Sequence, residues 1–179
     1  MKIRVEEIKD KVLDLSAVEE VAGYPALAAL QEAGECLFLG PLEVQLSVAR
    51  EYDHIRAHGR VTTKVRLGCS RCLSEYETDI DSPFTVFYMP AAAGVAQDEE
   101  VELTEEDLVS ATYEGDEIDF AQEITEQVLT EIPVKPLCSE DCKGLCPVCG
   151  TDLNEAVCGC QKEPFNIKFE ALKNIKIEK

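Results

Sequence analysis

The 179-residue chain has no tryptophan and only two histidines, and its basic residues are few. It carries 17 Lys and Arg against 36 Asp and Glu, so the formal net charge is −19 at pH 7. A surface of this charge repels phosphate groups. The composition therefore disfavours DNA as a partner of the surface as a whole, although a local basic face for RNA stays open.

Long apolar runs are also missing. The longest nearly apolar stretch, residues 24–30, is far shorter than the ~20 residues that a helix needs to span a bilayer. Residues 1–8 lack the unbroken apolar core of a signal peptide. We therefore expect a cytoplasmic protein without a membrane partner. Nine cysteines in that reducing compartment indicate metal binding before disulfide formation.

Basic residues are absent from one long segment. Between Arg71 and Lys135 there is no Lys or Arg, whereas residues 72–134 hold 18 of the 36 acidic residues. The densest acidic run predicts a loop that docks a basic partner, and a solubilising loop is the alternative. The residues of this docking run are Asp98, Glu99, Glu100, Glu102, Glu105, Glu106 and Asp107.

Three segments alternate apolar and polar residues with the period of a β-strand. Residues 42–48, 60–67 and 76–84 predict an antiparallel meander with one buried and one wet face. Pairing inward residues with inward ones across the loop between the second and third strands sets Leu67 opposite Tyr76. The pattern thus predicts a register as well as a sheet.

The second predicted strand is basic on its outer face. The same register sets Arg66 opposite Glu77 and Lys64 opposite Asp79, and such cross-strand pairs are worth ~0.2–1 kcal/mol each. Pairing with the acidic strand is one explanation of these cations. The other is a face that contacts RNA phosphates directly, formed by Arg56, Arg60, Lys64 and Arg66 with His58 beside them.

Helical patterns flank this sheet. Residues 119–133 predict a helix with Asp119 as N-cap, apolar residues at four-residue spacing and Pro133 as its end. Residues 16–34 are expected to hold one or two short helices, and residues 165–172 a terminal one. The predicted fold class is α+β, with an antiparallel meander or partly closed sheet packed by one or two helices.

Eight of the nine cysteines divide into two sets of four. Structural zinc takes four ligands in a tetrahedron, and a C-x-x-C turn places two sulfurs on one side of the ion. The preferred division gives a first site of Cys69, Cys72, Cys138 and Cys142 and a second of Cys146, Cys149, Cys158 and Cys160. The competing division joins the first pair to Cys146 and Cys149. Cys36, left over in an apolar stretch, is expected to be buried.

The predicted cofactors are therefore two structural zinc ions, because a closed four-thiolate site has no open position for a substrate. Iron–sulfur ligation of the same cysteines stays open. A redox C-x-x-C is disfavoured because the first pair joins two strands. His54 and His58, without an HExxH frame, are interpreted as solvated or turn residues, and no enzyme is predicted.

The domain organisation follows from these patterns. Residues 1–135 are predicted to form a β-rich α+β domain with a zinc-knuckle hairpin at residues 69–72. Residues 136–179 are predicted to form a cysteine-rich zinc module with a terminal helix.

Three ordered motifs resemble the YceD family of bacterial and plastid proteins. They are CSRCL at residues 69–73, GDEIDF at 115–120 and PLCSEDCKGLCPVCG at 136–150. The likeness runs from about residue 41 to the tail. The family's motif cysteines match Cys69, Cys72, Cys138 and Cys142, and the later four occur in only some members.

The resemblance implies a role in accumulation of large-subunit ribosomal RNA and in large-subunit assembly, without an established catalytic activity. A large-subunit assembly intermediate or a basic ribosomal protein is then the expected partner. The alternative from another class is a zinc-stabilised protein-interaction adaptor unrelated to ribosomes.

Overall fold

The main sheet of the protein is built on one long hairpin. The computed structural model describes residues 1–9, 11–52, 54–91 and 110–160. Strands β4 (Leu42–Glu51), β5 (His54–Gly68) and β6 (Glu75–Pro90) pair antiparallel in sequence order. The strands extend beyond the predicted limits, but the predicted register is confirmed, since Leu67 pairs with Tyr76.

Further strands widen this meander on both sides. β2 (Leu13–Glu19) pairs antiparallel with β4, and β7 (Ser110–Tyr113) pairs parallel with β6. The short β3 (Leu37–Phe38) pairs with β5 at the end that β4 leaves uncovered. Within the described residues, β2 and β7 form the two ends of an open order, β2-β4-β5-β6-β7.

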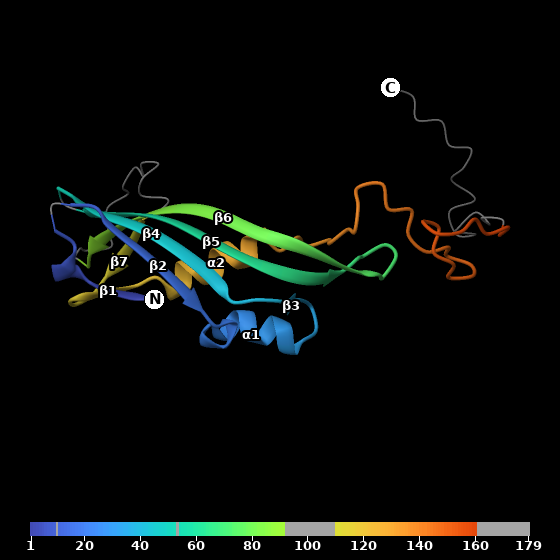
Figure 1. Cartoon of the computed structure of the whole chain (residues 1–179), viewed down its shortest axis with the longest axis horizontal. Helices are drawn as coiled ribbons and strands as arrows, with labels where there is room; N and C mark the ends of the chain where they lie inside the picture. Colours follow the sequence, from blue (N-terminus) through green and yellow to red (C-terminus); the bar gives the residue numbers. More distant parts are fainter. Residues whose placement is uncertain (10, 53, 92–109, 161–179) are drawn as a thin grey trace, which may run out of the picture.

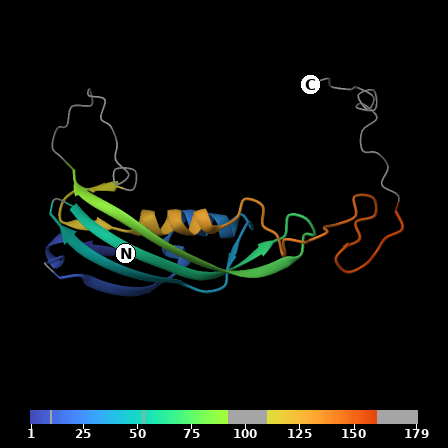
Figure 2. The same cartoon turned by 90° about the horizontal axis from the view of Figure 1, so that it is seen from above.

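Two helices cover the inner face of the sheet (Figures 1 and 2). α2 (Ala121–Glu131) buries Ile124 and Val128, and α1 (Pro25–Glu32) buries Leu27. Because β-strand side chains alternate, the inward residues of β4 and β5 form a continuous apolar layer beneath these helices. Its largest members include Leu42, Val44, Val48, Ile55, Val61, Val65 and Leu67. The α+β class with an antiparallel-rich sheet and two helices is thereby confirmed.

A second, two-stranded sheet closes one end of the core. β1 (Lys2–Arg4) pairs antiparallel with β8 (Glu117–Asp119), and Ile3 and Ile118 are buried. The chain also makes single 3-10 turns at Val5–Glu7 and Val21–Gly23. The second of these, with α1, accounts for the short helices expected between residues 16 and 34.

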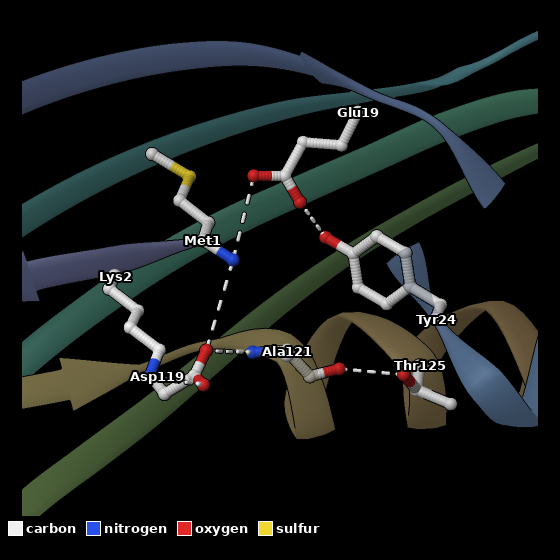
Figure 3. A network of polar contacts seen from close by, with 7 residues as sticks. All are labelled: Met1, Lys2, Glu19, Tyr24, Asp119, Ala121 and Thr125. Carbon is white, nitrogen blue, oxygen red and sulfur yellow. Dashed lines mark hydrogen bonds and ion pairs between the residues drawn. The ribbon is translucent and has the colours of Figure 1, made fainter. Parts of the chain in front are cut away.

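A polar network fixes this small sheet to β2 and the two helices (Figure 3). The amino group of Met1 lies 3.5 Å from Glu19 and 3.8 Å from Asp119. The Tyr24 hydroxyl donates to Glu19, and burial together with this carboxylate raises the pKa of Tyr24. The prediction of Asp119 as N-cap was wrong by one residue. Phe120 occupies that position, because Asp119 still belongs to β8, although its side chain accepts from the Ala121 N–H at 3.1 Å.

Candidate metal centres

The tip of the β5–β6 hairpin folds into a tight turn that carries Cys69 and Cys72. The Leu73 N–H donates to the Cys69 carbonyl at 2.9 Å, and the Cys69 N–H donates to the Ser74 carbonyl at 2.8 Å. Leu73 takes a positive φ of 62°, which reverses the chain after the second cysteine. The turn leaves both sulfurs on one side of the hairpin tip.

The segment that follows α2 returns to this tip (Figures 1 and 2) and carries Cys138 and Cys142. The Ser70 N–H donates to the Pro136 carbonyl at 2.8 Å and so attaches the returning chain to the hairpin. The Sγ atoms of Cys69 and Cys142 are 3.7 Å apart, and those of Cys72 and Cys138 are 3.6 Å apart. A tetrahedron with Zn–S bonds of ~2.3 Å requires sulfurs ~3.8 Å apart. The first set of four therefore fits a tetrahedral ion.

Protein groups surround three of these four cysteines closely, whereas Cys138 is exposed. Cys69 is 1% exposed and Cys142 is 3% exposed. The backbone N–H of Arg71 donates to Cys69 Sγ at 3.4 Å, and the Ser74 hydroxyl lies 2.9 Å from Cys72 Sγ. Such N–H and O–H groups stabilise thiolate charge and orient metal ligands.

Thiol acidity is divided unequally in this set. The backbone N–H groups of Cys138 and Cys72 lower the pKa of Cys69 to about 6. Hydrogen bonding to the thiols of Cys142 and Cys72 raises the pKa of Cys138 to about 12. Four thiols this close can all lose their protons only when a cation offsets their mutual repulsion, which is what a divalent metal ion supplies.

The second set of four repeats the turn of the first. The Gly150 N–H donates to the Cys146 carbonyl at 2.9 Å, and the Cys146 N–H donates to the Thr151 carbonyl at 2.8 Å. Gly150 has a positive φ of 73°. The Thr151 hydroxyl lies 3.1 Å from Cys149 Sγ, and the Ser74 hydroxyl lies 2.9 Å from Cys72 Sγ. The two knuckles are thus the same structure, C-x-x-C followed by a positive-φ residue and a hydroxyl residue.

Cys158 and Cys160 complete the second set from the end of the described chain. One ligand atom from each of the four cysteines lies within 4.8 Å of the others. The Thr151 hydroxyl and N–H lower the pKa of Cys149 to about 6, and hydrogen bonding to Cys149 raises the pKa of Cys160 to about 12. The structure therefore assembles the preferred division of the eight cysteines, and both sets could hold a metal ion.

Sequence reasoning missed the residues that support the sulfurs. Arg71 donates from its guanidinium to the Cys142 carbonyl at 2.9 Å and to the Glu140 carbonyl at 3.3 Å. The only signal for Ser74 and Thr151 was the hydroxyl residue five positions after the first cysteine of each knuckle. Cys36 is buried, as expected, and burial raises the pKa of its thiol.

The cations of β5 that suggested an RNA-contacting face all have carboxylate partners. Arg66 lies 2.7 Å from Glu77, and Lys64 lies 3.5 Å from the same side chain. The register neighbour of Lys64 is Asp79, as predicted, but its ion pair is with Glu77. Arg60 pairs with Asp81 and Arg56 with Glu51. These contacts favour the cross-strand explanation, and direct RNA contact by this face stays a prediction.

Other expected features have different outcomes. The acidic run from Asp98 to Asp107 and the helix at residues 165–172 lie outside the described residues. Both histidines belong to strand β5 and not to turns, but His58 is exposed, as the solvated interpretation expected. His54 packs edge-on against the Phe87 ring, with 5.3 Å between centroids, and His58 Nδ1 lies 2.8 Å from the Thr85 hydroxyl. The alternating pattern had continued through them, because β5 begins at His54.

The fold and the cysteine sets define the class of protein: an α+β sheet protein whose hairpin tip and following segment carry two potential tetrathiolate metal centres. No helix in the described ranges has the length and apolar character needed to cross a membrane. The family model of the large ribosomal RNA subunit accumulation protein YceD matches residues 57–176. The chain belongs to this family.

Curated relatives come from plants and bacteria. An Arabidopsis thaliana protein, named large ribosomal RNA subunit accumulation protein YCED homolog 1, chloroplastic, is 29% identical over 76% of this chain and 49% of its own. The Zea mays protein of the same name is 27% identical over 72% of this chain and 50% of its own. An uncharacterized Mycobacterium leprae protein is 32% identical over 63% of this chain and 49% of its own. The chain thus spans about half the length of these relatives, and no solved structure matches it.

Proposed function

We propose that the protein is a non-enzymatic zinc-binding factor that supports accumulation of large-subunit ribosomal RNA during ribosome assembly. The observation that carries the proposal is that the family match, residues 57–176, takes in both cysteine sets. The names of the family and of its plant relatives support the ribosomal role. The arrangement of the cysteines in two sets of four supports zinc as the cofactor.

Two zinc ions are the proposed cofactors. The sulfur separations of the first set match tetrahedral zinc, and cysteine alone completes each set. A closed four-thiolate site has no open coordination position, which supports a structural ion and a factor without catalytic activity. Metal analysis of the purified chain should give two zinc per molecule. A coloured protein that contains iron would show instead that the cysteines hold an iron–sulfur cluster.

A basic ribosomal protein, alone or within a large-subunit assembly intermediate, is the proposed partner. The net charge of −19 favours encounter with a basic surface, and the acidic run Asp98–Asp107 concentrates that charge. The cations that would serve RNA are already paired: Arg56, Arg60, Lys64 and Arg66 each lie within 4.0 Å of a carboxylate oxygen. A bound phosphate would have to displace those carboxylates. The reduced thiols that metal binding requires support a location in the cytoplasm.

A salt titration of binding separates protein from RNA as the direct partner. Wild-type chain should bind basic large-subunit proteins with an affinity that falls as salt rises, and isolated ribosomal RNA fragments more weakly. A variant with the seven acidic residues of the docking run changed to amides should lose the protein binding. A matched variant with Arg60, Lys64 and Arg66 changed to Gln should keep it. If the wild type binds RNA and only the Arg60, Lys64 and Arg66 variant loses that binding, the protein contacts RNA directly instead.

An adaptor unrelated to ribosomes is the second candidate, and one surface feature favours it. An apolar hollow of about 480 Å³ lies beside the second cysteine set, lined in part by Pro147, Val148, Leu153 and Val157. Val148 is 64% exposed and Val157 is 98% exposed, so the hollow could receive an apolar side chain of a protein partner. Depletion of the protein distinguishes the two. A fall of large- against small-subunit RNA supports the ribosomal role, and an unchanged ratio supports the adaptor.

A further inference from the structure

The two cysteine sets share a short piece of chain. Cys142 is the last ligand of the first set and Cys146 is the first ligand of the second, so only residues 143–145 separate them. A segment this short cannot be ordered for one set and disordered for the other. The geometry of residues 143–145 therefore bears on both sets at once.

Backbone hydrogen bonds place this segment between the two knuckles. The Leu145 N–H donates to the carbonyl of Arg71, in the hairpin turn of the first set, at 3.0 Å. On the other side Leu145 forms a β-bridge with Asp152, and the Leu153 N–H donates to the Gly144 carbonyl at 2.9 Å. The chain of the second set thus continues a small ladder that starts at the first knuckle.

Gly144 is the position where these parts approach most closely. Its φ is +71°, and a Cβ built there would lie 2.9 Å from the Arg71 carbonyl oxygen. A side chain at this residue would be strained by its backbone conformation and would push the first knuckle away. Glycine therefore permits the contact between the two sets.

Asn154 makes the direct link to a ligand sulfur. It lies in the loop of the second set, between Cys149 and Cys158, yet its amide nitrogen is 3.4 Å from Cys142 Sγ of the first. Its amide oxygen accepts from the Lys143 N–H at 2.8 Å, which fixes the orientation of the amide, because only an oxygen can face that donor. The same nitrogen donates to Asp152 at 2.8 Å. Asn154 is thus held with its N–H aimed at a thiolate of the other set.

We propose that the two centres bind metal cooperatively and that Asn154 is the positioning residue that couples them. This inference rests on the proposed two-metal function. A metal ion in the second set fixes the loop between Cys149 and Cys158, and the fixed loop holds the Asn154 donor against Cys142. Four thiolates and a divalent ion carry a net charge of −2, which such a donor stabilises. By linkage, metal in the first set favours the second to the same extent.

Cobalt(II) binding to the full chain under reducing conditions measures this coupling. Variants Cys158→Ser/Cys160→Ser and Cys69→Ser/Cys72→Ser each keep one set, and competition with a chelator gives the affinity of each remaining set. The product of the two single-set association constants should be at least about tenfold below the overall constant of the wild type, since orienting partners of metal ligands are worth ~10–100-fold. Equality of the two values would overturn the coupling.

Asn154→Ala tests the residue, with Glu155→Ala as a matched change in the same loop. In the chain with both sets, Asn154→Ala should weaken the first centre about tenfold and shift its cobalt–thiolate charge-transfer band to lower energy, because the sulfur loses a donor. Glu155→Ala should change neither. In the Cys158→Ser/Cys160→Ser background the effect of Asn154→Ala should largely disappear, which a generally destabilising change would not show.

The outcomes separate the coupling from the proposed function. Two cobalt ions bound with independent affinities, and an Asn154→Ala variant equal to wild type, would overturn the coupling and leave the two-metal protein intact. Binding of fewer than two ions by the wild type would overturn the proposed function and the coupling together.

Discussion

The two cysteine sets are built from the same knuckle, but the segments that they join are separated by different lengths of chain. Each begins with C-x-x-C, turns at a residue of positive φ and places a hydroxyl near the second sulfur. Leu73 has a φ of 62° in the first knuckle, and Gly150 has 73° in the second. The Cys69 and Cys146 N–H groups donate to the carbonyls of Ser74 and Thr151, both at 2.8 Å. Local chemistry therefore does not distinguish the sets.

Their places in the fold distinguish them. The first joins the β5–β6 hairpin to chain that arrives after α2, and its sulfurs on Cys69 and Cys142 are buried. The second closes between Cys146 and Cys160, with Cys149 exposed. A link that spans long sequence separation removes more freedom from the unfolded chain than a local one. The same motif can therefore stabilise a whole domain or only its own loop.

The largest effect is expected when cysteine ligands of one set are replaced. At saturating zinc, Cys69→Ser/Cys72→Ser should lower the Tm of the sheet by on the order of 10 °C. By analogy with a disulfide, a link from residue 72 to 138 is worth about 4 kcal/mol, and 1 kcal/mol moves Tm by about 2–4 °C in a chain of this size. Cys158→Ser/Cys160→Ser should lower it by no more than a few degrees. Circular dichroism melts with zinc analysis measure both, and equal shifts would contradict the difference in reach.

The next effect falls on the contact between the sets. Gly144→Ala should weaken metal binding by roughly 10- to 100-fold, because the strain of a positive φ and the overlap with Arg71 are together worth ~1–3 kcal/mol. Gly68→Ala is the control, since a Cβ there meets nothing within 4 Å and Gly68 directly precedes Cys69. Cobalt(II) titration of both variants tests this. Normal affinity in Gly144→Ala would show that the sets do not need their close approach.

These differences show which parts of the molecule the sequence could predict. Spacing was enough to find the two C-x-x-C knuckles, because each is a local pattern, and to prefer the observed division of the cysteines over the competing one. Alternation was enough to set Leu67 opposite Tyr76, because a slip by one residue would turn every apolar side chain of β5 to water. Both predictions use information that lies within a few residues.

The remaining features depend on contacts between distant segments. β7 has four residues and pairs parallel with β6, and β1 and β8 have three each, too short for a period to appear. Asp119 was assigned to a helix cap because the strand that contains it forms only by pairing with residues 2–4, which are distant in the sequence. The contact of the Asn154 amide with Cys142 forms only in the folded chain, and no sequence pattern indicates it.

A smaller effect is expected from substitutions at the positive-φ position of each knuckle. Gly150→Ala should destabilise the second centre by about 1 kcal/mol, because an L side chain is strained in this conformation. Leu73→Gly should be neutral or stabilise the first by up to about 1 kcal/mol, since the strain it relieves exceeds the added entropy of the unfolded chain. Leu73 is 72% exposed, so little packing is lost. Chelator competition measures both, and a large loss in Leu73→Gly would reveal a role for its exposed side chain.

The smallest expected effect concerns the hydroxyls beside the two knuckles. Thr151→Ala should weaken the second centre a few-fold, and Ser74→Ala should do the same for the first, because each removes one hydroxyl contact from a sulfur. In the metal-free protein the Thr151 hydroxyl is the first cause of the lowered pKa of Cys149, about 6. A lowered pKa means that this thiol is ionised from about pH 6 upward, so the pH midpoint of its alkylation by iodoacetamide should rise in Thr151→Ala. Peptide mass spectrometry after alkylation across pH 5–9 follows this thiol by itself. An unmoved midpoint for Cys149 would mean that the Thr151 N–H and the thiols of Cys146 and Cys160 set its acidity, and that the hydroxyl common to both knuckles is not needed for it.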